Sequence, residues 1–78
     1  MSNIKKYKKV FIESFSIKED LLNTLEFNSI PEWDSIGHMT LIGDLEKIFD
    51  VSIETDDIID FSSYKKGIEI LKKYKIEI

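Results

Sequence analysis

Apolar residues recur every three or four positions through most of the chain, a spacing that predicts helices. In residues 3–15 the apolar residues would lie on one side of a helix and several lysines on the other, so we expect an amphipathic helix there. A second stretch, residues 35–50, carries a wider apolar stripe and is expected to form the next long helix. The residues expected to form this stripe are Ile36, Met39, Leu41, Ile42, Leu45, Ile48 and Phe49.

The connection between these two helices is long and has its own signals. Ser16 and Glu19 have the spacing of a capping box, which predicts a helical turn or two through residue 25. Pro31 disfavours helix at the residue before it, so residues 26–34 are expected to form an ordered loop. The side chains expected to pin this loop to the core are Phe27, Ile30 and Trp33.

Capping residues mark two further helices in the last third of the chain. Thr55 before two aspartates is typical of a helix start, because early acidic residues favour the helix dipole. Ser63 is a second candidate cap, and lysines lie at the end of residues 64–75. We therefore predict an all-α fold: a small four-helix bundle with three longer helices, one short third helix and a long loop between helices 1 and 2. A single domain is expected to cover residues 1–78.

The distribution of charge narrows the choice of partners and metals. Residues 19–60 hold twelve acidic residues and one base, Lys47, whereas the other ten lysines flank this segment. Such an acidic centre repels phosphate backbones, so we expect no nucleic-acid partner and favour partners with basic surfaces. The chain has no cysteine, which excludes disulfides and thiolate metal sites. The acids at 54–60 lack the loop pattern of an EF-hand, and we expect no metal site.

Hydropathy gives an expectation about location. No apolar run reaches the roughly 18 residues that a membrane-spanning helix needs. Residues 1–6 lack the apolar stretch of a signal peptide. We therefore expect a cytoplasmic protein without a membrane span, and we expect a monomer.

Ser35 is the most informative polar residue, because it opens the predicted helix 35–50. The spacing of Asp34, Ser35 and His38 argues against a hydrolase triad, since the first two are neighbours and no nucleophile elbow is present. His38 is expected to be a partly exposed helix residue. A phosphate esterified to the Ser35 hydroxyl would lie beside free backbone N–H groups and the positive end of the helix dipole.

The motif Asp34-Ser35-Ile36, followed by a helix that carries acids and ends in Gly-Asp-Leu-Glu-Lys-Ile-Phe, resembles the acyl carrier protein family of phosphopantetheine-binding four-helix domains. The resemblance extends over roughly residues 4–75 and includes the length, the helix order, the long first loop and the acidic centre. It implies that Ser35 carries 4′-phosphopantetheine, added from coenzyme A by a phosphopantetheinyl transferase that uses Mg²⁺. The chain would then be a carrier rather than an enzyme, holding acyl intermediates as thioesters for partner enzymes.

The same resemblance implies roles for other residues. Asp34 would help to position the transferase and its metal. Ile36, Met39 and Ile53 would give apolar contacts to partners or to the arm. The acidic residues implied to face the basic surfaces of acyl-loading and acyl-transferring enzymes are Asp44, Glu46, Asp56 and Asp57.

Three departures from the family pattern bear on the pathway. Carriers of primary fatty-acid synthesis usually have acids where this chain has Gly37, Thr40 and Lys47. The resemblance therefore implies a carrier for a fatty-acid-like pathway or, more narrowly, for one specialised biosynthetic pathway. Two alternatives stay open: a carrier of aminoacyl or peptidyl groups, including D-alanine, and a small helical interaction module whose Ser35 is never modified.

Overall fold

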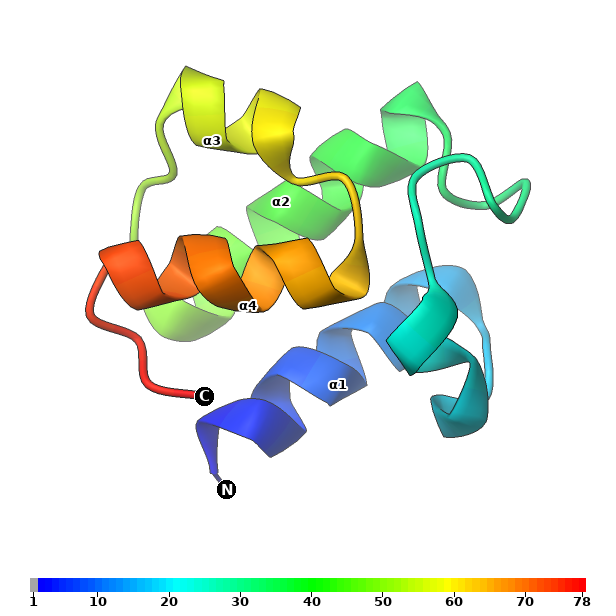
Figure 1. Cartoon of the computed structure of the whole chain (residues 1–78), viewed down its shortest axis with the longest axis horizontal. Coiled ribbons are helices and arrows are strands. Elements are labelled where there is room, and N and C mark those ends of the chain that lie inside the picture. The colour runs from blue at the N-terminus through cyan, green and yellow to red at the C-terminus, as the bar shows by residue number, and fades with distance from the viewer. Residues whose placement is uncertain (1) are drawn as a thin grey trace.

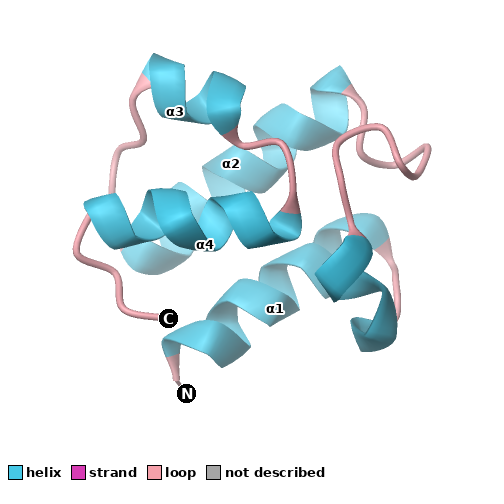
Figure 2. Cartoon of the chain, viewed as in Figure 1, coloured by secondary structure: helices cyan, strands magenta, loops and turns pink. Residues whose placement is uncertain are grey.

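The structure, a computed structural model, describes residues 2–78 and places most of them in helices (Figure 1). A 3₁₀ helix, η1 (Glu19–Thr24), lies in the connection between the first two α-helices. Among the described residues there is no strand, only an isolated bridge between Glu26 and Ser63 (Figure 2). The predicted all-α class, with its short third helix and long first loop, is confirmed. The four α-helices are α1 (Asn3–Phe15), α2 (Ser35–Phe49), α3 (Thr55–Asp60) and α4 (Tyr64–Lys73).

Side-chain caps explain where two of the helices begin. The hydroxyl of Ser2 accepts a hydrogen bond from the backbone N–H of Lys5 at 3.4 Å, in front of α1. The hydroxyl of Ser63 accepts from the N–H of Lys66 at 2.9 Å, in front of α4. Each cap satisfies one of the N–H groups that a helix leaves without an internal partner. The predicted cap at Ser63 is confirmed.

Two other predicted caps are wrong. Ser16 ends α1 in the left-handed backbone region, with φ 53°, and its N–H bonds the carbonyl of Ile12. An N-cap needs extended backbone, and the residue that has it before η1 is Lys18. In the same way Glu54, rather than Thr55, is the extended residue before α3, and its side chain makes no cap hydrogen bond.

Aromatic rings fill the space between α1, α4 and the loop 26–34. Phe11 is fully buried, and its ring lies 4.9, 5.6 and 5.2 Å from those of Tyr7, Trp33 and Tyr64. All three pairs are T-shaped, an arrangement that aromatic rings favour. The buried hydroxyl of Tyr7 donates to the carbonyl of Tyr64 at 2.6 Å, and burial raises the pKa of Tyr7. We refer to the following six side chains as the aromatic core: Tyr7, Phe11, Phe15, Trp33, Phe61 and Tyr64.

Two glycines allow close approaches that a larger residue would block. A Cβ at Gly67 in α4 would overlap the Phe61 ring and the Tyr7 hydroxyl, so α4 packs on the aromatic core through this gap. A Cβ at Gly37 in α2 would overlap the backbone carbonyl of Glu32, so the loop passes directly against the first turn of α2. Gly43 has open space around it, and nothing in the structure requires glycine there.

Helix α3 is attached mainly by polar contacts. Both carboxylate oxygens of Asp57 are engaged, one by the Lys73 ammonium and the other by the Tyr74 hydroxyl, each at 2.5 Å. The same Tyr74 hydroxyl accepts from the N–H of Glu54 at 2.9 Å, just before α3. Of the six residues of α3, only Asp57 is buried.

The arrangement separates the chain ends from the start of α2. The side-chain amide of Asn3 donates to the carbonyl of Glu77 at 2.9 Å, so the two ends of the chain lie together. The loop 26–34 and the start of α2 lie on the opposite side of the molecule (Figure 1). Within residues 2–78, no helix combines the length and the apolar character that crossing a bilayer would require.

Candidate functional site

Ser35 is the first residue of α2 and is exposed. The residue that caps the helix is Asp34, whose Oδ1 accepts from the N–H of Gly37 at 2.8 Å. The main-chain carbonyl of Asp34 accepts the next N–H, that of His38, at 2.8 Å. These bonds hold the first turn of α2 without using the Ser35 side chain, so its hydroxyl is available for chemistry.

The first turn of α2 also has unused donors. The first four N–H groups of a helix have no partner inside it, and Asp34 takes those of Gly37 and His38. The N–H groups of Ser35 and Ile36 precede the first bond of the helix and make no hydrogen bond within residues 2–78. Together with the positive end of the helix dipole, they favour a phosphate group bonded to Ser35.

Apolar side chains around Ser35 are exposed to an unusual degree. Ile36 is 78% exposed, Met39 is 56% exposed, and Ile59 in α3 is 72% exposed. The predicted apolar stripe of α2 is thus wrong at Ile36 and Met39, because this turn of the helix extends past the core. The part of the stripe that is buried consists of Leu41, Ile42 and Leu45.

A pocket of about 320 Å³ opens beside Ser35, between α2, α3 and the loop 26–34. Its walls are mostly apolar, and two serines, Ser35 and Ser62, are among the residues that line it. The sequence pointed to Ser35 and Met39 but not to this pocket, since its walls come from four separate segments. The remaining lining residues are Phe27, His38, Ile58, Ile59 and Phe61.

His38 forms a bridge across this site. Its Nδ1 is 2.9 Å from the indole nitrogen of Trp33, and its Nε2 is 2.8 Å from the carbonyl oxygen of Ile58. Both ring nitrogens are therefore occupied, and no hydrogen bond joins His38 to Ser35 among the described residues.

Two of the residues expected to contact partners are parts of the folded interior. Ile53 is 6% exposed and lies in the hydrophobic core. Asp57 is 7% exposed, and hydrogen bonds from Lys73 and Tyr74 hold its pKa below the usual range. These two predictions are corrected: neither side chain offers a surface to a partner, because the core takes the first and α4 takes the second.

The other expected contact residues have mixed positions. Asp56 is exposed, and Asp44 is exposed while accepting a hydrogen bond from the Ser14 hydroxyl at 3.1 Å. Glu46 is half-buried, and its Oε2 accepts from the N–H of Ile53 at 2.8 Å, which fixes the segment between α2 and α3. Only Asp44 and Asp56 of these acids present their carboxylates outward.

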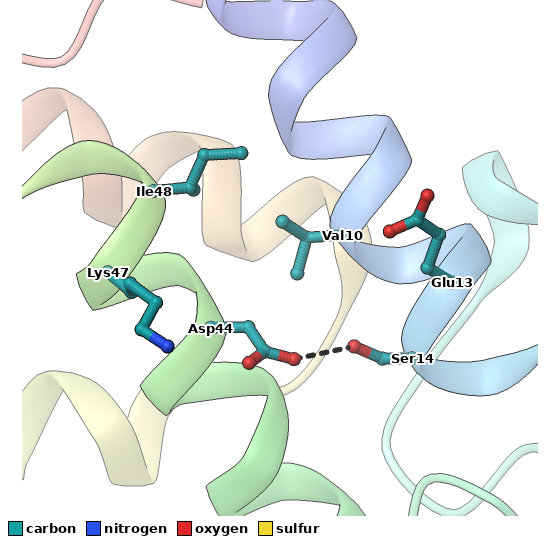
Figure 3. Close-up of a pocket in the computed structure, with 6 residues that line it drawn as sticks. All are labelled: Val10, Glu13, Ser14, Asp44, Lys47 and Ile48. Atoms are coloured by element: carbon teal, nitrogen blue, oxygen red, sulfur yellow. Dashed lines mark hydrogen bonds between the residues drawn. The ribbon is translucent and has the colours of Figure 1, made fainter.

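A second hollow, of about 400 Å³, lies between α1 and α2 (Figure 3). Figure 3 shows Asp44 and Ser14 reaching toward each other across it, so the hydrogen bond ties the two helices together. The walls mix both charges with apolar groups, and the Asp44 carboxylate accepts the Ser14 hydroxyl proton in a hydrogen bond. The residues that line it are Val10, Glu13, Ser14, Asp44, Lys47 and Ile48.

Within residues 2–78, no group of three or more histidine, cysteine, aspartate or glutamate side chains could hold a metal ion. A scan against models of known protein families and a search of curated proteins find no match for this chain.

Proposed function

We propose that this protein is a carrier of acyl groups, with Ser35 as the attachment point of a 4′-phosphopantetheine arm. The observation that carries the proposal is the environment of Ser35: an exposed hydroxyl at the first position of α2, beside an apolar pocket. The arm, when attached, supplies the reactive thiol that this cysteine-free chain does not have.

The residues around Ser35 fit such an arm. The N–H groups of Ser35 and Ile36, which make no hydrogen bond within the described residues, favour its phosphate. The pocket beside Ser35 gives an apolar surface for the group that the arm carries. Only Oδ1 of Asp34 accepts a hydrogen bond in the described chain, so the second oxygen is available to the transferase and its metal.

The exposed surface near Ser35 also fits a protein that visits several enzymes. Ile36, Met39 and Ile59 offer apolar contacts, and Asp56 on α3 offers negative charge. Contacts of this kind are small and steered by charge, which suits partners that must bind and then leave. The chain would act as the substrate of its partner enzymes rather than as a catalyst.

A dedicated pathway is favoured over general fatty-acid synthesis. Glycine at position 37, where primary carriers usually have an acid, has a structural reason here, because the Glu32 carbonyl occupies the space of a side chain. Thr40 and Lys47 further reduce the negative charge of α2. Partner enzymes that require a strongly acidic helix after the serine would bind this surface less well.

Mass spectrometry after incubation with coenzyme A, Mg²⁺ and a broad-specificity phosphopantetheinyl transferase tests the proposal. One phosphopantetheine group should be added, and peptide mapping should locate it on Ser35. Ser35→Ala should abolish the addition and change stability by less than about 0.5 kcal/mol, because Asp34 caps the helix. Ser62→Ala, at the edge of the same pocket, is the matched control and should be modified normally.

An unmodified chain, or a group mapped to a different serine, would contradict the proposal and favour an interaction module. If the group is added, the mass of the cargo on protein isolated from its native cells separates an acyl from an aminoacyl carrier.

A further inference from the structure

The chain contains one histidine and one tryptophan, and the structure brings them together next to Ser35. His38 is half-buried on α2, one turn after Ser35. The plane of its imidazole lies within 16° of the Trp33 ring plane, with centroids 6.2 Å apart, so the two rings meet edge to edge through the hydrogen bond between them. The rings of Phe27 and Phe61 meet it edge-on at 5.4 and 6.2 Å.

The two hydrogen bonds of His38 fix its protonation state. An indole N–H can only donate, so the Nδ1 that it contacts at 2.9 Å must be unprotonated. A carbonyl oxygen can only accept, so the Nε2 that lies 2.8 Å from Ile58 must carry the proton. The bridge therefore requires neutral imidazole in the Nε2–H tautomer.

This bridge joins three segments that are separate in the chain. Trp33 belongs to the loop before Ser35, His38 to α2, and Ile58 to α3. Both His38 and Ile58 line the pocket beside Ser35. Since α3 buries little apolar surface of its own, the bond from His38 is one of the few contacts that hold α3 in place next to the pocket.

Protonation of Nδ1 is incompatible with this arrangement. It would place two N–H donors against each other at 2.9 Å, in a site from which water is largely excluded. Trp33 is fully buried and cannot turn away, so the imidazole must move. Its bond to Ile58 would be disturbed at the same time, because both bonds belong to one rigid ring.

The elements packed around His38 carry many acidic residues, but within residues 2–78 none of them forms an ion pair with the imidazole. None of the three ion pairs in the described chain involves His38. Histidine is the side-chain type that proteins commonly use as a switch between pH 5 and 8. The acids on the elements packed around the imidazole are Glu26, Glu32 and Asp34 in the loop, Asp44 and Glu46 on α2 and Asp56, Asp57 and Asp60 on α3.

We propose that His38 is a positioning residue that holds α3 against α2 while it is neutral, and that its protonation releases α3 and opens the pocket beside Ser35. The effect on loading of Ser35 rests on the function proposed above, whereas the bridge and its release do not. The signal is therefore the binding of a proton to His38, and the helix that moves in response is α3.

The bridge is tested on the unmodified full chain by nitrogen NMR and by Trp33 fluorescence. At pH 8 the imidazole nitrogens should have the shifts of the Nε2–H tautomer. Between pH 8 and 5 the emission of the single tryptophan should change, since protonation breaks the hydrogen bond of the indole N–H and places a positive charge beside the ring. Amide exchange at Ile58 and Ile59 should accelerate several-fold beyond its intrinsic pH dependence.

His38→Phe is the main variant, because phenylalanine keeps the ring packing with Trp33 and removes both hydrogen bonds. Its fluorescence and its α3 exchange should be independent of pH between 5 and 8. His38→Gln, which can still donate and accept, should restore slow exchange in α3 without restoring the pH dependence. The Nδ1–H tautomer at pH 8, or the same pH dependence in wild type and His38→Phe, would overturn the proposal.

Loading of Ser35 by the transferase gives the functional measurement. The ratio of wild-type to His38→Phe loading rates cancels the transferase's own pH dependence and should change between pH 8 and 5, mainly through KM. A constant ratio would overturn the link to loading. If Ser35 is never modified, the proposed function fails, but the NMR and fluorescence results still decide whether the bridge exists.

Discussion

The aromatic core and helix α3 are held by different kinds of interaction. In the aromatic core, Phe11 alone contacts five other rings, and its side chain is fully buried. Helix α3 instead depends on the carboxylate of Asp57, the imidazole of His38 and the hydroxyl of Tyr74. Burial of apolar surface does not depend on pH, whereas each of these polar contacts involves a titratable group.

The comparison implies that the two regions differ in local stability. Segments with few buried apolar contacts open locally at lower free energy than the core of the same domain. We therefore expect α3 to open before the aromatic core does. Since α3 forms one wall of the pocket beside Ser35, the part of the molecule that moves most easily is the part nearest the proposed cargo.

The largest expected effect comes from breaking the aromatic core. Phe11→Ala should lower the free energy of unfolding by about 3–5 kcal/mol, because it removes a fully buried ring and leaves a cavity. Urea denaturation followed by circular dichroism measures it. Phe27→Ala, in the exposed part of the loop, is the control and should cost much less. Equal losses would mean that the two sites are packed alike.

The second effect separates two glycines on different helices. Gly67→Ala should destabilise the protein by about 1–3 kcal/mol, because its methyl group would overlap Phe61 and Tyr7 in the aromatic core. Gly43→Ala should stabilise it by up to about 1 kcal/mol, since alanine favours helix and the site is open. Thermal unfolding of both variants checks the opposite signs, and the same sign in both would contradict this account of α4 packing.

The sequence predicted the parts of this fold that depend on one helix at a time. The bounds of α1 and α2 followed from apolar spacing, and Trp33 is buried as expected for a side chain that pins the loop, whereas Phe27, expected to do the same, is 36% exposed. The exposure of Ile36 did not follow, because periodicity says which face a residue lies on but not where the neighbouring helix ends. Where the neighbouring helix ends is decided by tertiary packing, which the spacing of apolar residues does not encode.

The candidate site was predicted at Ser35 and Asp34 but not around them. Trp33 and His38 are five residues apart in the sequence. Because Trp33 precedes α2, the regular spacing of helical side chains does not predict that the two rings meet. Their pairing depends on how the loop folds back over the first turn. A signal was present nonetheless: the chain's only tryptophan and only histidine stand on either side of the serine.

The third effect is confined to α3 and concerns how firmly this helix is held at low pH. Hydrogen bonds from Lys73 and Tyr74 lower the pKa of Asp57 in the folded state. The stabilisation is therefore present above the ordinary aspartate pKa of about 3.9 and is lost as pH falls through the lower folded-state value. Asp57→Asn should speed amide exchange in α3 at pH 7 and remove its acid dependence below about pH 4.

Asp56→Asn is the matched control for this prediction, because Asp56 is the exposed neighbour on the same helix. Exchange in α3 should be unchanged in that variant. If both variants behave alike, net charge rather than the contacts of Asp57 governs the attachment of α3.

The smallest effect on stability should accompany a clear effect on loading. Ile59 is 72% exposed on α3, so Ile59→Ala should change the free energy of unfolding by less than about 0.5 kcal/mol. The same side chain lines the pocket beside Ser35, where the transferase of the proposed function would approach, so its loss should raise the KM for loading several-fold with little change in kcat. Leu21→Ala, an exposed apolar residue on η1 that does not line the pocket, should change neither quantity. If Leu21→Ala slows loading as much as Ile59→Ala, exposed apolar residues affect loading wherever they lie on the protein. In that case α3 is not part of the docking surface.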